Sequence, residues 1–335
     1  MHRRHSIMAS VAPTDPVGES LDISSLFNPP YVMFSLDRAM ELQRKKHILK
    51  LRDGRDLAYI VDGDPSKPAV ILCHGLFGSG GTLIGPPRDD LYMILPDRPN
   101  YGQSSPHKDY TFASWAEDVR ELVDHLKIEC FHVIGASSGG PSALAVKSLL
   151  GNRCKKCVII SGDTQYAKTG DEFLNGELMC FAPGKACSPC LPLCCLCCLP
   201  IMKSGMNFDS MWANIENGKF KEAGMSSEID YKLALAAGKD HLGWNTQLMI
   251  EEISRGSAGP IGDAINESKP WPFEVSHLVD VDLWHGTADV SVPYKECLSN
   301  KKLMPNAQIR TIEGAGHDMG IRVVSMALDH VAKSI

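Results

Sequence analysis

The chain has 335 residues, 44% of them hydrophobic, so it can bury a large core and form a globular protein of enzyme size. Its net charge is −6 and it carries no long basic run, so it lacks the usual electrostatic signature of a nucleic-acid-binding protein. A neutral or acidic small molecule is the kind of partner that this charge favours.

The first residues of the chain contain two arginines but no apolar stretch behind them, so we do not expect a secretory signal. We interpret residues 1–45 as an amino-terminal tail. A transit peptide is the alternative, because the first 14 residues include basic side chains and no acidic one. The sequence favours a cytoplasmic protein.

From residue 46 onward, short apolar runs alternate with amphipathic ones, which is typical of a doubly wound, mostly parallel α/β sheet. The first element is a predicted hairpin at 47–64 around an Asp-Gly turn. The predicted elements that follow are strands at 69–73 and 91–97, a helix at 112–128, a strand at 131–135, a helix at 138–150 and a strand at 155–163.

After residue 163 the alternation stops for about a hundred residues that are rich in Met, Cys, Pro and Gly. Helical fragments within this stretch indicate an inserted helical cap at 164–270. The sheet pattern then resumes with a strand at 277–286, a helix from about Pro293, a strand at 307–314 and a helix at 320–334. We therefore expect an α/β core made of residues 46–163 and 271–335.

Residues 133–145, "VIGASSGGPSALA", place two adjacent serines between a predicted strand and a predicted helix. A nucleophile elbow is such a turn, and the residues two before and two after its serine must be small. Gly135 and Gly139 satisfy this requirement around Ser137, whereas centring the turn on Ser138 places an alanine at the first position. We predict Ser137 as the nucleophile and the backbone N–H of Ser138 as an oxyanion donor.

A serine nucleophile needs a histidine base and an acid that orients it, and in this type of fold their order is serine, acid, histidine. Asp289 lies in the loop after a predicted strand, and His317 lies in a glycine-rich loop after the last one. Asp163 also ends a strand and is the alternative acid. Asp282 falls inside a strand pattern, so we expect a structural role for it.

The loop at 73–81, "CHGLFGSGG", follows the strand where a second oxyanion donor is usual. We predict the backbone N–H of Leu76 as this donor, with Phe77 as the alternative. His74 and His285 both precede a glycine, and for both we expect a packing or hydrogen-bonding role at a strand end.

With "HGLFGSG", "DRPNYGQSS", "GASSGG", "LWHGTADVSVP" and "GAGHD" in this order, the chain resembles the capped serine hydrolases of the α/β-hydrolase fold superfamily over residues 46–335. The resemblance implies Ser137 as nucleophile, Asp289 as acid, His317 as base, and Leu76 and Ser138 as oxyanion donors.

The chain departs from the usual Asp-Arg-Pro-Gly-Tyr-Gly pattern by having Asn100 in place of glycine. Asparagine tolerates left-handed backbone better than most residues, so we expect the turn to be preserved. Epoxide hydrolases and haloalkane dehalogenases of this architecture have an aspartate at the elbow, where this chain has Ser137. Attack by serine would give an acyl-serine, which points to esters, thioesters or amides.

The sequence therefore predicts an esterase- or lipase-like hydrolase that cleaves carboxylic esters of fairly apolar acyl substrates through an acyl-enzyme. Neither a cofactor nor a metal is needed for this reaction. Acyl transfer, cofactor-free perhydrolysis, and a slow receptor-like or non-enzymatic protein of the same fold stay open as alternatives.

Seven of the 12 cysteines crowd into one stretch of the predicted cap. In a chain of this length without a secretory signal, reduced thiols are expected. The first interpretation is an apolar lid, the second is reversible palmitoylation with peripheral membrane association, and the third is a metal site with C-x-x-C spacing. The seven are Cys180, Cys187, Cys190, Cys194, Cys195, Cys197 and Cys198.

Overall fold

The computed structural model describes residues 18–27, 34–169, 207–219, 221–223, 225, 227–256, 258–317 and 320–334. The cysteine-rich stretch of the predicted cap lies outside the described residues, so the three interpretations of it stay predictions.

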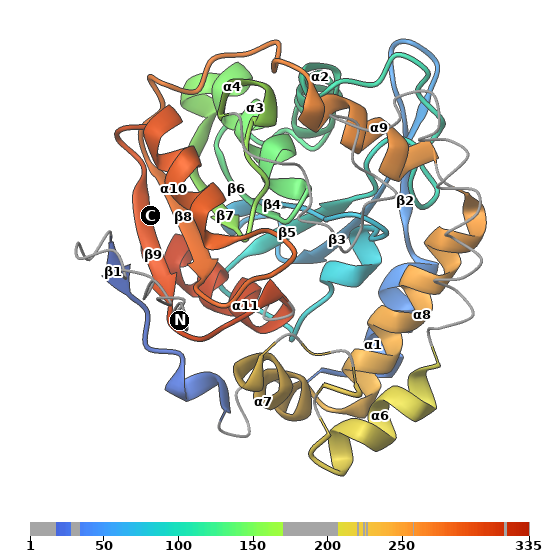
Figure 1. The fold of residues 1–335 in the computed structure, drawn as a ribbon. Coiled ribbons are helices and arrows are strands. Elements are labelled where there is room, and N and C mark those ends of the chain that lie inside the picture. Colours follow the sequence, from blue (N-terminus) through green and yellow to red (C-terminus); the bar gives the residue numbers. More distant parts are fainter. Residues whose placement is uncertain are drawn as a thin grey trace, which may run out of the picture.

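A nine-stranded sheet forms the centre of the molecule, with the strand order β1-β9-β8-β7-β6-β4-β5-β3-β2 (Figure 1). β3 runs antiparallel to its neighbours β2 and β5, and the other pairings are parallel. The mostly parallel α/β sheet expected from the sequence is confirmed. The strands are β1 (Glu19–Ser20), β2 (His47–Lys50), β3 (Asp56–Gly63), β4 (Ala69–Cys73), β5 (Tyr92–Pro96), β6 (Phe131–Ala136), β7 (Cys154–Ile160), β8 (Val281–Gly286) and β9 (Gln308–Ile312).

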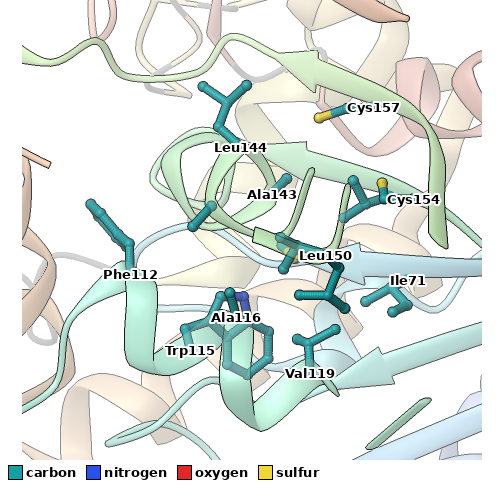
Figure 2. Close-up of a cluster of buried hydrophobic side chains, with 14 of the residues drawn as sticks. Ile71, Phe112, Trp115, Ala116, Val119, Ala143, Leu144, Leu150, Cys154 and Cys157 are labelled. Carbon is teal, nitrogen blue, oxygen red and sulfur yellow. The ribbon is translucent and has the colours of Figure 1, made fainter. Parts of the chain in front are cut away.

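Helices cover both faces of the sheet because the central strands are apolar on both sides. In β4, Ile71 and Cys73 join one buried cluster while Val70 and Leu72 join another on the opposite face. Figure 2 shows part of the first cluster, where side chains of α2, α3, β4 and β7 meet. The helices are α1 (Leu36–Arg44), α2 (Phe112–His125), α3 (Gly139–Leu150), α4 (Tyr166–Thr169), α6 (Phe208–Glu216), α7 (Glu228–Ala237), α8 (Lys239–Arg255), α9 (Ala258–Ser268), α10 (Tyr294–Leu303) and α11 (Gly320–Ala332).

Part of the expected amino-terminal tail is built into the fold, which corrects our interpretation of residues 1–45. β1 pairs with β9 at the edge of the sheet, and α1 packs against β3 and α8. Ala39 of α1 is fully buried, and Arg38 donates a hydrogen bond of 2.9 Å to the carbonyl of Gly85. A two-residue strand is too short to show an alternating pattern in the sequence. The start of α1 could have been predicted, because serine is a favoured N-cap residue and Ser35 caps this helix.

Among the described residues, five helices lie between β7 and β8 in the chain, within the range expected for the cap: α4 and α6 to α9. They contact the core at defined points, such as the hydrogen bond of 3.0 Å from Trp244 Nε1 in α8 to the carbonyl of Gly81. Among the described residues, no helix is long and apolar enough to cross a membrane. The domain boundaries at 163 and 271 stay a prediction.

His132 of β6 makes the stability of the fold sensitive to acid. It is buried, and Nδ1 has no hydrogen-bond partner among the described residues. Burial first, then the charges of Lys156 and Lys147, lower the pKa of His132 to about 4 from its ordinary 6.5. Between these values the unfolded chain binds more protons than the folded one, so the free energy of unfolding falls as the pH falls.

We therefore expect His132 to account for a loss of about 2 kcal/mol in the free energy of unfolding between about pH 7 and about pH 5. Denaturant titrations of the wild type and of His132→Gln at both pH values measure it. Because His74 and His285 are present in both proteins, the difference between the two pH slopes isolates His132. Equal slopes would contradict the prediction.

Candidate active site

Ser137 occupies the sharp turn between β6 and α3, with a left-handed φ of +53°. The turn leaves no room on either side of it. A Cβ atom added to Gly135 would lie 2.2 Å from the carbonyl oxygen of Gly139, and one added to Gly139 would lie 2.2 Å from that of Cys73. The small residues required by a nucleophile elbow therefore have a steric cause here.

Three side chains form a chain of hydrogen bonds at the carboxyl ends of the strands. His317 Nε2 lies 3.1 Å from Ser137 Oγ, and His317 Nδ1 lies 2.9 Å from Asp289 Oδ2. The other carboxylate oxygen of Asp289 accepts hydrogen bonds from the backbone N–H groups of Ser291 (3.0 Å) and Val292 (2.9 Å). The structure thus brings together the predicted serine, histidine and aspartate.

The surroundings of Asp289 favour its ionised form. Burial raises the pKa of this carboxyl, but the hydrogen bond and charge of His317, with smaller contributions from His285 and the N–H of Val292, outweigh burial and bring it below its ordinary value. An ionised carboxylate can only accept a hydrogen bond, so the network assigns the proton of a neutral His317 to Nδ1. Nε2 is then able to accept the hydrogen bond from Ser137.

His285 lies next to this network without joining it. Its Nε2 is 2.7 Å from the carbonyl of Val292 and 3.6 Å from Asp289 Oδ2. Burial lowers the pKa of His285, so the ring is neutral and donates from Nε2 to the carbonyl. This is the hydrogen-bonding role at a strand end that the sequence predicted.

The alternative acid, Asp163, and the strand residue Asp282 are engaged elsewhere. Asp163 is buried after β7 and accepts hydrogen bonds from Ser138 Oγ (3.2 Å) and from the hydroxyl of Tyr166 (2.8 Å). Burial raises the pKa of Asp163. Asp282, inside β8, lies 2.7 Å from Nε2 of His330. The structure therefore places Asp289 beside His317, and it places neither Asp163 nor Asp282 within hydrogen-bond distance of that ring.

The predicted oxyanion loop approaches the nucleophile. A Cβ atom added to Gly75 would lie 3.0 Å from Ser137 Cβ, so the backbone of this turn lies directly beside the serine. Leu76 follows Gly75 and is half-buried, and Ser138 occupies the N-cap position directly before α3. The donor roles of Leu76 and Ser138 stay predictions.

Three further observations concern residues around this site. Asn100 adopts a φ of +70°, so asparagine does take the left-handed turn that glycine usually occupies. Asp230 of α7 accepts a hydrogen bond of 3.0 Å from the N–H of Gly316, directly before His317, and sequence reasoning missed it because its helix is 86 residues away. Within the described residues, no cluster of three or more His, Cys, Asp or Glu side chains is placed to hold a metal ion.

Comparisons with known proteins agree with this architecture. The family model described as alpha/beta hydrolase fold matches residues 68–178. The uncharacterized hydrolase YcgS of Bacillus subtilis is 30% identical over 135 residues, which make up 38% of this chain and 46% of that protein. The sn-1-specific diacylglycerol lipase ABHD11 of Mus musculus is 21% identical over 267 residues, which make up 77% of this chain and 78% of the lipase.

Solved structures also match the fold of this chain. The esterase RhEst1 from Rhodococcus sp. ECU1013 matches with a TM-score of 0.59 and 15% identity, covering 86% of this chain and 97% of the esterase. The chain thus spans less than half of the Bacillus hydrolase but nearly all of the esterase structure. At this level of identity the structural likeness establishes the fold, and the activity has to be argued from the site.

Proposed function

We propose that this chain, which has the fold of the α/β hydrolases, is a serine hydrolase that cleaves carboxylic esters with a fairly apolar acyl group. The observation that carries this proposal is the position of His317, with one ring nitrogen on Ser137 and the other on Asp289. A serine hydroxyl becomes a nucleophile when a base takes its proton and an acid holds that base in the correct tautomer.

In the proposed reaction, Ser137 Oγ attacks the ester carbonyl carbon while His317 Nε2 takes the hydroxyl proton. The tetrahedral intermediate collapses, the bond to the alcohol oxygen breaks, and His317 gives its proton to the departing alcohol. Water, activated by His317 in the same way, then attacks the acyl-Ser137. The bond to Ser137 Oγ breaks, the carboxylic acid is released, and His317 returns the proton to Ser137 Oγ. The ionised Asp289 stabilises the imidazolium formed in each step.

The oxyanion of each intermediate needs donors that are in place before the reaction. We assign this role to the backbone N–H groups of Ser138 and Leu76. The close approach of Gly75 to Ser137 supports the assignment of the second donor. A preference for apolar acyl groups is supported by the relative named as a diacylglycerol lipase.

The direct test is covalent labelling of the purified full-length protein with a fluorophosphonate probe, followed by mapping of the labelled peptide. We expect one labelled residue, Ser137, because only an activated serine displaces fluoride at a useful rate. Replacing His317 by alanine should abolish the labelling without unfolding the protein. Labelling elsewhere, or labelling that survives this replacement, would refute the proposed nucleophile.

Once labelling is established, p-nitrophenyl esters of increasing acyl length measure the acyl preference. Product analysis with an added alcohol or peroxide measures transfer or perhydrolysis against hydrolysis. Multiple turnovers with free acid as the main product are the expected result. A reaction that stops near one turnover would instead indicate a receptor-like protein.

A further inference from the structure

Arg98, in the loop after β5, is a fully buried cation whose side chain points at the predicted oxyanion loop. Its Nε donates a hydrogen bond of 3.0 Å to the carbonyl of His74, and a terminal nitrogen donates one of 3.3 Å to the carbonyl of Gly75. The other terminal nitrogen lies 2.6 Å from Asp263 Oδ1. One guanidinium therefore joins the backbone beside the nucleophile to a carboxylate of α9.

The ring of His74 adds a donor to the same carbonyl group. The backbone N–H of Arg98 donates to His74 Nε2 at 3.0 Å, so the ring proton resides on Nδ1, which lies 2.9 Å from the carbonyl oxygen of Gly75. Burial, and then the charge of Arg98, lower the pKa of His74, which keeps this tautomer neutral.

These contacts fix the direction of a second group. The C=O of Gly75 and the N–H of Leu76 belong to one planar trans peptide unit, in which they point in opposite directions. Holding the carbonyl toward Arg98 and the His74 ring therefore turns the N–H of Leu76 away from them. That N–H is the proposed oxyanion donor.

Asp263 comes from α9, within the range predicted as the cap, and is fully buried. Its second oxygen accepts a hydrogen bond of 2.6 Å from the hydroxyl of Tyr101. The ring of Tyr101 lies 4.9 Å from the guanidinium carbon of Arg98 and packs tightly on α9, where a Cβ atom added to Gly259 would come within 2.6 Å of it. The anion that neutralises Arg98 is thus supplied by the inserted helices and not by the sheet.

We propose that Asp263 and Arg98 are positioning residues for the hydrolysis, through which helix α9 sets the orientation of the Gly75–Leu76 peptide. This proposal rests on the proposed function. Without the carboxylate, Arg98 has to find another anion or water, and its forked contact with the two carbonyls is released. The oxyanion donor then loses its alignment in the transition state, while substrate binding in the ground state changes little.

Glu252 of α8 provides a matched control. It is also a buried carboxylate of the inserted helices, and it accepts a hydrogen bond of 2.9 Å from the N–H of Gly102, in the same loop as Arg98. It has no hydrogen bond to the carbonyls of His74 or Gly75 among the described contacts. A purely structural link between the inserted helices and the core would respond to Glu252→Gln as it does to Asp263→Asn.

The test compares kcat, KM and the inhibition constant of a trifluoromethyl ketone for the wild type, Asp263→Asn and Glu252→Gln. The ketone forms a hemiketal with the serine whose oxyanion occupies the oxyanion hole. We expect Asp263→Asn to lower kcat about 10- to 100-fold with KM within about 3-fold, and to weaken the ketone by the same factor as kcat/KM. Glu252→Gln should keep kcat within about 2-fold even where it lowers the melting temperature.

Hydrogen exchange of the peptide spanning residues 74–79 gives a readout that does not need activity. Asp263→Asn should speed its exchange about 10-fold relative to the wild type, and Glu252→Gln should not. If Asp263→Asn fails to fold, Tyr101→Phe removes only the hydroxyl that contacts Asp263. It should lower kcat about 3-fold and speed the exchange of residues 74–79 about 3-fold.

The proposal is overturned if Asp263→Asn, or Tyr101→Phe in its place, keeps kcat and the exchange rate of residues 74–79 at wild-type values. Equal losses in Asp263→Asn and Glu252→Gln would also overturn it, by showing a structural role. A wild type that hydrolyses no ester and takes no fluorophosphonate would instead refute the proposed function. In that case the exchange measurement alone decides whether Asp263 positions the loop.

Discussion

Replacing Ser137 by alanine is expected to lower kcat for ester hydrolysis by about 10⁵-fold or more, because it removes the atom that forms the acyl-enzyme. The fold should be unaffected. The hydroxyl is one half-buried group, and the left-handed φ of +53° is held by the backbone bonds of the elbow. These bonds run from the N–H of Ser137 to the carbonyl of Ile160 (2.9 Å) and from the N–H of Gly140 to the carbonyl of Ser137 (2.7 Å).

The neighbouring serine is the matched control for this prediction. Ser138→Ala keeps the backbone N–H that we assign to the oxyanion and removes only a hydroxyl bonded to Asp163. We expect a loss of about 10-fold or less from it, since one neutral hydrogen bond beside the site is lost. Steady-state kinetics on one ester, with melting temperatures for both variants, measure the contrast. If Ser138→Ala were the more severe change, the register of the elbow would be wrong.

The fold was predictable because its signals are local. Buried parallel strands are short apolar runs, and the helices between them repeat apolar residues at helical spacing, as around Trp115 in α2. The same holds for the elbow, where the glycines around Ser137 follow from the close contact of strand and helix. These features depend on neighbours a few residues apart.

The contacts that position the site were not predictable, because their partners lie far apart in the sequence. Asp263 is 165 residues from Arg98, and Asp230 is 86 residues from Gly316. No period or motif marks either aspartate as a partner of an active-site loop. The choice between Asp163 and Asp289 had the same difficulty, since both follow a strand and only the position of His317 separates them.

That choice is tested by the two asparagine variants. Asp289→Asn should lower kcat by about 10⁴-fold, because an amide can no longer hold the proton of His317 on Nδ1 and stabilise the imidazolium. The asparagine oxygen can still accept from the N–H groups of Ser291 and Val292, so the loop should stay in place. A melting temperature close to the wild-type value would separate lost chemistry from lost structure.

Asp163→Asn is the matched control, since Asp163 is as deeply buried and also follows a strand. Burial raises the pKa of Asp163, which brings it nearer to the neutral form, so replacing it by a neutral amide of the same shape changes less. The amide oxygen can still accept from one of the two hydroxyls that contact Asp163, those of Ser138 and Tyr166, and the amide NH2 group can donate to the other. We expect a loss of kcat of about 10-fold or less, as for removal of a hydrogen bond at the edge of the site. The reverse order of severity would mean that His317 pairs with Asp163 in the working enzyme, and that the hydrogen bond of 2.9 Å to Asp289 is exchanged during turnover.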